Sequence, residues 1–276
     1  MNATSLSETE ERAAAPAARA CPLCAARDAE PLPRYSRDGW QIGRCRGCGF
    51  VYLTNPPASE ALEEEYAWES SFAEEAGRRL KAAPALYGLD YATRLRTRLF
   101  RRDEMAKYRR WFGDGGAVLD IGCGDGSRLA APFTPCGIEI SRRLAAEADA
   151  RMRALGGYCL QGATLEVIGR FPEAHFDGIV MRSYLEHEPQ ALPVLEGAHR
   201  VLKPGGAIYV KVPNFGSVNR RLIGRNWCGF RHPDHVNYFT LDSLREIARR
   251  AGLRLSLVNP LNLPFDDNIH ALLRPI

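Results

Sequence analysis

The sequence contains no long apolar stretch and no secretory leader. None of its 276 residues lies in a run of about 18 consecutive apolar residues, the length at which a helix spans a bilayer. The first twenty residues are polar and alanine-rich, without the apolar centre of a signal peptide. We therefore expect neither a membrane span nor an export signal, and predict a cytoplasmic protein.

Lysine is scarce, occurring at only four positions, so that nearly all positive charge comes from arginine. The formal net charge is +4, from 37 basic and 33 acidic residues. This excess is too small to indicate a nucleic-acid partner without a localised patch. The arginines between residues 94 and 110 are interrupted by Asp103 and Glu104, which favours a solvated helix face. We accordingly expect no nucleic-acid partner.

The chain has no internal repeat, and its composition divides it into four segments. Residues 1–20 have no hydrophobic period and are predicted to be a disordered lead. Residues 21–54 carry paired cysteines and form a small module of their own. Residues 55–113 are rich in Glu and Arg with helical spacing, which predicts connecting helices. Residues 114–276 are predicted to form the main domain.

In the main domain, short apolar runs alternate with helical segments, which is typical of a mostly parallel sheet covered on both faces. The predicted strands are 117–121, 137–140, 158–161, 177–181, 207–212, 253–258 and 268–273. The predicted helices are 142–155, 189–202 and 241–251. Lys203-Pro204-Gly205-Gly206 is expected to stop the second helix. The last two strands have no helix between them, which predicts an antiparallel hairpin. The expected fold is α/β, with a Rossmann-like, seven-stranded, mostly parallel sheet.

The most informative segment is glycine-rich and runs from Val118 to Gly126. A buried strand leads directly into Gly122 and Gly124, where the absence of a side chain lets the backbone approach a ligand closely. Glu139 follows at the end of the second predicted strand, where a carboxylate can bind both ribose hydroxyls of an adenosine. Together these features predict a nucleoside cofactor.

The details of the turn decide which nucleoside. A dinucleotide site needs the spacing G-x-G-x-x-G, whereas here the third glycine is Gly126 and Ser127 follows it. Asp120 precedes the first glycine, where its carboxylate would repel a pyrophosphate and attract the ammonium group of a methionine. S-adenosylmethionine, which is cationic and lacks phosphate, fits these residues better.

From about residue 95 the chain resembles class I S-adenosylmethionine-dependent methyltransferases. The matching motifs are Val118–Gly126, Gly137–Ser141, Gln161-Gly162, Phe176-Asp177 through Leu185-Glu186-His187, and Arg200–Gly206. Five motifs in this order are highly specific. The resemblance implies that Ala163, Thr164 and Leu165 lie near the adenine, and Arg182 and Ser183 near the methionine end. The cofactor-binding residues implied in full are Asp120, Gly122, Cys123, Gly124, Gly126, Glu139, Ile140, Ala163, Thr164, Leu165, Arg182 and Ser183.

Eight cysteines in a reducing compartment do not suggest a disulfide framework. Two Cys-x2-Cys pairs separated by twenty residues match a four-thiolate zinc ribbon, because each pair presents two sulfurs from a tight turn. With four protein ligands no position remains for a reactive water, so the zinc is expected to be structural. The predicted ligands are Cys21, Cys24, Cys45 and Cys48. The remaining four cysteines are expected to pack as small apolar side chains.

A zinc module followed by a class I domain is similar to the sugar C-methyltransferases that act on nucleotide-linked deoxysugars. That family has a His/Glu/His cluster followed by an aromatic pair, and the segment from Phe230 to Phe239 is similar to it. Here Asp234 takes the place of the family's glutamate and His232 that of its tyrosine. The family's further carboxy-terminal domain has no counterpart. These departures leave other small-molecule acceptors open, including acceptors of O-methylation.

Methyl transfer to a protonated nucleophile needs a base, and His235 is the first candidate because imidazole accepts a proton near neutral pH. His187 is the second candidate, with Asp234 and Glu186 as orienting or secondary groups. The alternative is that His232 and His235 cap or brace the segment before the final helix, and that Glu186-His187 is a helix start that shapes the pocket.

The sequence thus predicts a methyltransferase acting on a small molecule, such as a nucleotide-linked sugar or a natural-product intermediate. An RNA methyltransferase anchored by its zinc ribbon, and a non-catalytic protein that binds S-adenosylmethionine, are the alternatives. The sequence leaves the acceptor and the oligomeric state open.

Overall fold

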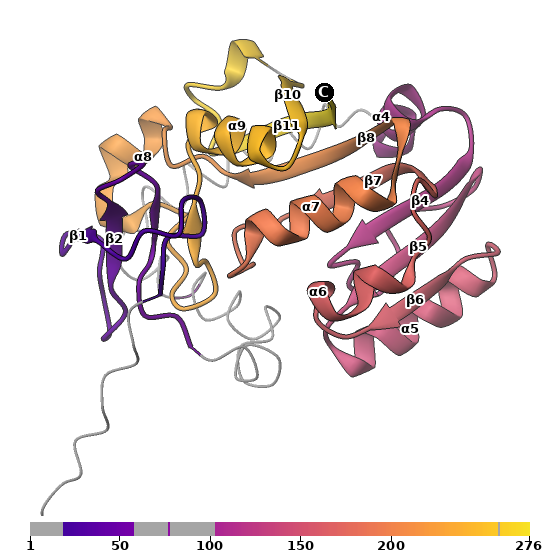
Figure 1. Cartoon of the computed structure of the whole chain (residues 1–276), viewed down its shortest axis with the longest axis horizontal. Coiled ribbons are helices and arrows are strands. Elements are labelled where there is room, and N and C mark those ends of the chain that lie inside the picture. The colour runs from indigo at the N-terminus through magenta and orange to yellow at the C-terminus, as the bar shows by residue number, and fades with distance from the viewer. Residues whose placement is uncertain (1–18, 58–76, 78–102, 259) are drawn as a thin grey trace, which may run out of the picture.

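The computed structural model describes residues 19–57, 77, 103–258 and 260–276, which form two sheets and the helices around them (Figure 1). The smaller sheet has the order β1-β2-β3-β9. Its strands are β1 (Ala29–Pro31), β2 (Ile42–Cys45), β3 (Val51–Leu53) and β9 (Asn237–Tyr238). Within these residues, no helix has the length and apolar character needed to cross a bilayer.

The larger sheet has seven strands in the order β10-β11-β8-β7-β4-β5-β6. The strands are β4 (Gly116–Ile121), β5 (Phe133–Glu139), β6 (Tyr158–Gln161), β7 (Phe176–Arg182), β8 (Leu202–Pro213), β10 (Leu253–Leu257) and β11 (Asn268–Pro275). Strands β4 to β8 are parallel to one another, whereas β10 and β11 form an antiparallel hairpin beside β8. The predicted α/β fold is confirmed.

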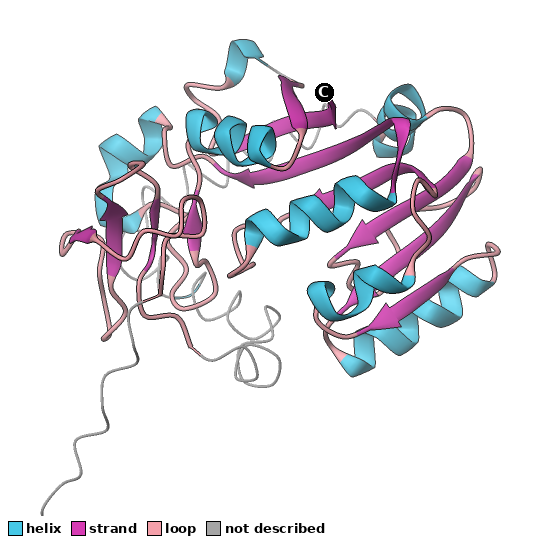
Figure 2. Ribbon diagram, in the orientation of Figure 1, coloured by secondary structure: helices cyan, strands magenta, loops and turns pink. Residues whose placement is uncertain are grey.

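Helices flank the larger sheet, and α8 (Val218–Ile223) lies beside the smaller one (Figure 1 and Figure 2). The helices at the larger sheet are α4 (Glu104–Phe112), α5 (Arg142–Arg153), α6 (Thr164–Val167), α7 (Ala191–Val201) and α9 (Leu241–Arg250). Capping side chains define where two of them begin: Ser141 accepts a hydrogen bond from Leu144 N at the start of α5, and Thr240 forms a capping box with Ser243 at the start of α9.

Alternate residues of the central strands supply the cores on the two faces of the sheet. Val118 of β4 and Val180 of β7 pack in one apolar cluster with Tyr108 of α4. Their neighbours Leu119 and Ile179 belong to another cluster, which includes the apolar faces of α7 and α9. Because both faces are covered, the ends of the strands are the places where ligands can bind.

The segment Lys203-Pro204-Gly205-Gly206 differs from the sequence prediction. The helix before it ends at Val201, but these four residues belong to β8 and do not form a separate break. Lys203 Nζ lies 2.7 Å from Asp177 Oδ1, which holds this part of β8 against β7. The pairing of the two strands is irregular between Phe176 and Gly178, because Phe176 pairs with Leu202 and Gly178 with Ala207, which leaves residues 203–206 outside the regular register.

The amino-terminal sheet is completed by a strand from the far end of the sequence. Val51 pairs with Tyr238 in an antiparallel register, so β9 lies beside β3. Arg19 Nη2 also donates to Asn237 Oδ1 at 2.6 Å. Of the predicted disordered lead, residues 1–18 lie outside the described residues, as do residues 58–76 and 78–102 of the predicted connecting helices.

Candidate functional site

The glycine turn after β4 has the backbone that the sequence predicts. Gly122, Gly124 and Gly126 have φ of +70°, +59° and +75°, the left-handed region that glycine adopts most readily. A Cβ at Gly122 would lie 2.9 Å from Tyr184 Cδ2, and one at Gly126 would lie 2.9 Å from Ala148 Cα of α5. At Gly124 nothing lies within 4 Å of the Cβ position. Two of the glycines therefore allow close packing, and the third presents its backbone to open space.

Cys123, which lies between these glycines, turns its side chain inwards. The side chain is buried, and its Sγ lies 3.6 Å from Cys159 Sγ. A Cβ at Gly137 would lie 2.7 Å from the same sulfur. Any contact of Cys123 with a ligand at this turn would therefore be made by its backbone.

Glu139 ends β5 beside the turn, and its carboxylate is already oriented by two backbone groups. Oε2 accepts a hydrogen bond from Gly124 N at 2.8 Å, and Oε1 accepts one from Ser141 N at 3.0 Å. The side chain is 7% exposed, and the following Ile140 is 37% exposed. A carboxylate held in this way at the carboxyl end of a parallel strand is suited to bind the two hydroxyls of a ribose.

Asp120 is fully buried in β4, where Arg128 binds it. Arg128 Nη1 contacts both carboxylate oxygens and lies 2.6 Å from Oδ2. Burial raises the pKa of Asp120 to about 6, although the Arg128 guanidinium opposes this shift. An ammonium group attracted to Asp120, as the sequence predicts, would therefore have to share the carboxylate with Arg128. Arg128 was not among the predicted residues, and a basic residue shortly after the turn is the signal that could have found it.

Tyr184 connects three of the predicted cofactor-binding segments. Its ring covers Gly122, and its hydroxyl lies 2.8 Å from Thr164 Oγ1 and 2.6 Å from Glu188 Oε2. Thr164 is buried at the start of α6, where Ala163 is the N-cap, and Leu165 packs against the main apolar cluster. The turn, α6 and the end of β7 therefore meet around this tyrosine.

Arg182 and Ser183 follow at the carboxyl end of β7. Arg182 Nη1 lies 2.7 Å from Glu104 Oε2 of α4. Ser183 has a φ of +55°, and its N–H donates to Lys211 O at 2.9 Å. Both residues lie where β7 neighbours β4, the point at which the strand order of the sheet reverses and ligands bind in this type of fold. The glycine turn and Glu139 fit S-adenosylmethionine, because they combine an open glycine backbone with a carboxylate suited to bind a ribose.

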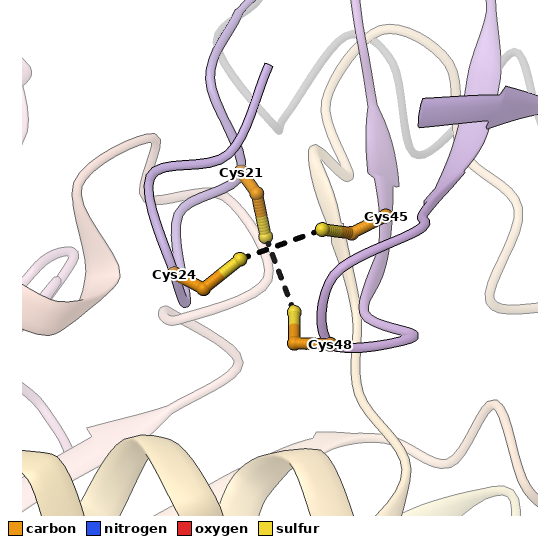
Figure 3. A group of neighbouring side chains, drawn as sticks. All are labelled: Cys21, Cys24, Cys45 and Cys48. Atoms are coloured by element: carbon orange, nitrogen blue, oxygen red, sulfur yellow. Dashed lines mark hydrogen bonds between the residues drawn. The ribbon is translucent and has the colours of Figure 1, made fainter. Parts of the chain in front are cut away.

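The four amino-terminal cysteines converge in the smaller module (Figure 3). Cys21 Sγ lies 3.6 Å from Cys48 Sγ, and Cys24 Sγ lies 3.4 Å from Cys45 Sγ. Zinc–sulfur bonds of about 2.3 Å place the sulfurs of a tetrahedral site about 3.8 Å apart. The sulfurs are too far apart for disulfides, and their spacing is close to that of a four-thiolate zinc site.

A second group of possible metal ligands consists of Glu186, His187 and His235. One donor atom from each lies within 4.8 Å of the others. The rings of His187 and His235 are nearly perpendicular, with centroids 4.7 Å apart. Burial raises the pKa of Glu186 to about 7 and lowers that of His187 to about 4. The structure thus brings together three of the four residues that the sequence predicted as catalytic.

The fourth predicted catalytic residue, Asp234, contacts this group through its backbone carbonyl. Its backbone carbonyl lies 3.0 Å from His187 Nδ1, and its buried carboxylate lies 3.6 Å from Arg231 Nη2. His232 Nε2 lies 3.1 Å from the carbonyl oxygen of Tyr35 in the smaller module, a contact of the kind that the bracing alternative predicts.

Comparison with known proteins places this arrangement in a family. A model of the methyltransferase domain matches residues 91–258, which is more than half of the chain. Three similar relatives are ubiquinone biosynthesis O-methyltransferases. The Ruegeria pomeroyi protein is 31% identical over 182 residues, covering 60% of this chain and 69% of that protein. The Cereibacter sphaeroides protein is 29% identical over 177 residues, covering 60% of this chain and 70% of that protein. The Paraburkholderia phytofirmans protein is 26% identical over 168 residues, covering 55% of this chain and 72% of that protein.

Among solved structures, an S-adenosylmethionine-dependent methyltransferase from Archaeoglobus fulgidus is similar with a TM-score of 0.49 and 18% identity, covering 61% of this chain and 91% of that one. The cysteine module lies outside the residues that the family model matches. The chain belongs to the methyltransferase-domain family and is an S-adenosylmethionine-dependent methyltransferase.

Proposed function

We propose that this methyltransferase transfers a methyl group to a hydroxyl oxygen of a small molecule. The observation that carries the proposal is the position of the Glu186, His187 and His235 group. It begins two residues after Tyr184, whose ring covers the glycine turn at which the cofactor would bind. The similarity to O-methyltransferases of ubiquinone biosynthesis supports a small hydroxylated acceptor.

Each residue type has a defined task in this reaction. S-adenosylmethionine, when bound, supplies a methyl group on a positively charged sulfur. Glu139 would hold the ribose, and Tyr184 would fix the distance between the turn and the segment after β7. Because transfer is an in-line displacement, holding the acceptor oxygen about 3 Å from the methyl carbon contributes much of the rate.

The histidines have the tautomer that binding a hydroxyl group requires. His235 Nδ1 lies 2.8 Å from the carbonyl oxygen of Gly229, and a carbonyl only accepts hydrogen bonds, so Nδ1 carries the proton. The neutral ring then has its lone pair on Nε2. His187 has the same arrangement towards Asp234 O. Either Nε2 could accept the hydrogen of an acceptor hydroxyl, and His235 remains the first candidate for the base.

The proposal is tested first by calorimetric titration with S-adenosylhomocysteine, with NADH as the control for a dinucleotide site. Methyl transfer is then measured on a panel of hydroxylated aromatic compounds and nucleotide sugars. Transfer to oxygen supports the proposal. Transfer only to a sugar carbon would favour the C-methyltransferase prediction, and cofactor binding without transfer to any acceptor would favour the non-catalytic alternative.

The RNA alternative is separated from the small-molecule proposal by its dependence on salt. Contacts with phosphates release counterions, so RNA binding would weaken steeply as salt rises. We expect no RNA binding even at low salt. Measurable binding that decreases with added salt would support the RNA methyltransferase.

We also propose that the four amino-terminal cysteines hold a structural zinc ion. The spacing of their sulfurs supports this assignment, and four thiolates leave no position for a reactive water. The zinc would hold the two cysteine turns together and thereby fix the smaller sheet. Metal analysis of the purified protein tests the proposal, since zinc-free native protein would contradict it.

A further inference from the structure

The buried group formed by Glu186, His187 and His235 brings together three side chains that can each offer a ligand atom to a metal ion. Glu186 is 1% exposed and His235 is 4% exposed. Within the described part of the chain, Glu186 Oε2 is buried and has no hydrogen-bond partner. A buried carboxylate oxygen without a hydrogen bond is costly, because it has lost its hydration, and the charges of Lys211 and Arg231 offset only part of this cost.

The two imidazoles add lone pairs to this carboxylate. Both rings use Nδ1–H to donate to backbone carbonyls, His187 to Asp234 O and His235 to Gly229 O. In the neutral rings the lone pairs are therefore on Nε2. Histidines that bind metals are typically oriented in this way, with one ring nitrogen held by a carbonyl so that the other faces the ion.

We propose that Glu186, His187 and His235 bind a divalent transition-metal ion. Two imidazoles and one carboxylate, with one possible ligand atom from each within 4.8 Å of the others, match the donor set and the compactness of such a site. A cation balances the buried carboxylate and accepts all three lone pairs. With the ion bound, Nε2 of His235 is a ligand and not the base, and the ion would take over activation of the acceptor hydroxyl by lowering its pKa. The ligand type favours zinc or its neighbours in the first transition row over magnesium, which prefers oxygen ligands.

Three protein ligands leave coordination positions open, unlike the four thiolates of the amino-terminal module. An open position accepts an oxygen ligand, so the acceptor class would be a molecule whose oxygen can coordinate the metal. The role of the metal in binding the acceptor rests on the proposed methyl transfer to a hydroxyl, whereas the metal site itself does not.

The test uses the full-length protein loaded with zinc, dialysed and analysed for bound metal. We expect about two equivalents per chain in the wild type and about one in Glu186→Gln, which keeps the shape of the side chain but removes its charge. The matched control is His199→Gln. His199 Nδ1 also bonds a backbone carbonyl, that of Ala251, but the residue lies outside the group. This control should keep both equivalents.

Cobalt substitution distinguishes the two sites by their ligands. Thiolate ligands give sulfur-to-cobalt charge-transfer absorption, whereas an imidazole and carboxylate site gives only ligand-field bands. We expect Glu186→Gln to lose only the non-thiolate bands, and Cys45→Ser to lose the charge-transfer absorption. S-adenosylhomocysteine affinity, measured in each variant, reports whether the cofactor site remains folded.

Wild-type protein that binds only the thiolate-bound equivalent, with the same cobalt spectrum in Glu186→Gln, would overturn the proposal. A proton on Glu186 would then balance the group. Failure of the metal site and failure of the proposed function are distinguishable. If the protein binds one equivalent of zinc and methylates a hydroxyl, only the proposal of the second metal site fails. If it binds two equivalents of zinc but methylates no hydroxylated compound, only the proposed function fails.

Discussion

At the scale of single residues, Glu139 makes the most specific contact expected with the cofactor. Replacing it by alanine removes two charge-assisted hydrogen bonds to the ribose, which should weaken S-adenosylhomocysteine binding by on the order of 2 kcal/mol, or roughly thirtyfold. Calorimetric titration measures the change. Glu147→Ala is the control, because Glu147 is an exposed residue of α5 that pairs with Arg143 on the same helix. Equal affinities in the two variants would remove the ribose assignment.

The ion pair between Arg128 and Asp120 predicts a second effect, on stability. Arg128→Met leaves the fully buried Asp120 carboxylate without its cation, which should lower the free energy of unfolding by about 3 kcal/mol at pH 8. Urea denaturation measures the loss. Arg151→Met is the control, since Arg151 of α5 pairs with Asp125 of the glycine turn at an exposed position and should contribute less than about 1 kcal/mol.

The pH dependence of this pair follows from the raised pKa of Asp120. The folded protein holds this proton up to about pH 6, whereas the unfolded chain releases it near 3.8, the ordinary pKa of an aspartate. The contribution of Asp120 to stability is therefore fully present below about pH 4 and is lost as the pH rises through about 6. In Arg128→Met the pKa should rise further, so the variant should lose less stability at pH 5 than at pH 8. A loss that is larger at pH 5 would contradict this account.

At the scale of elements, the glycine turn depends on its contact with α5. Gly126→Ala combines a φ of +75° with a Cβ placed 2.9 Å from Ala148 Cα, so the turn or the helix must shift. We expect a loss of roughly 2 kcal/mol or more in stability together with weaker cofactor binding. Thermal unfolding and titration measure the two effects. Gly169→Ala, where the Cβ position has nothing within 4 Å and φ is not positive, should change neither.

Elements with a strong local pattern could be predicted from the sequence. The turn after β4 and Glu139 were found because a buried strand, its glycines and the next strand lie close together in the chain. The start of β5 at Phe133 was missed, since Thr134 and Pro135 interrupt the apolar pattern. The strand β9 was also missed, because its two residues acquire strand geometry only by pairing with β3.

In the candidate site, too, some features could be predicted from the sequence and others could not. His187 and His235 were each chosen as candidate bases, but they lie in segments far apart in sequence. No local pattern shows that their rings come within 4.7 Å of each other, centroid to centroid. The pairing of Asp120 with Arg128 could not be predicted from the sequence for another reason. The side chain of an arginine in a turn can point either to solvent or towards the interior.

At the scale of the whole molecule, the cysteine module and the larger sheet are connected by backbone and side chains. Besides β9, Arg250 Nη1 of α9 donates to Leu23 O at 2.7 Å, within the first cysteine turn. Zinc removal should therefore destabilise the entire chain. We expect Cys45→Ser to lower the unfolding temperature by at least roughly 5 °C in one transition, because each kcal/mol corresponds to about 2–4 °C for a chain of this size.

Scanning calorimetry measures this shift, and Cys228→Ser is the control because Cys228 lies outside the zinc group. The control should unfold near the wild-type temperature. Two separate transitions in Cys45→Ser, with the upper one at the wild-type temperature, would show that the module and the larger sheet are energetically independent.

The pairing of β3 with β9 also sets the order in which the protein can assemble on the ribosome. Arg19 and Asn237, which form a hydrogen bond, are 218 positions apart, so β9 is translated long after its partner β3. The amino-terminal segment emerges first but has to wait, with an unpaired strand edge, until most of the chain has left the exit tunnel. Early capture of zinc by the nascent cysteines would shield that segment during the wait.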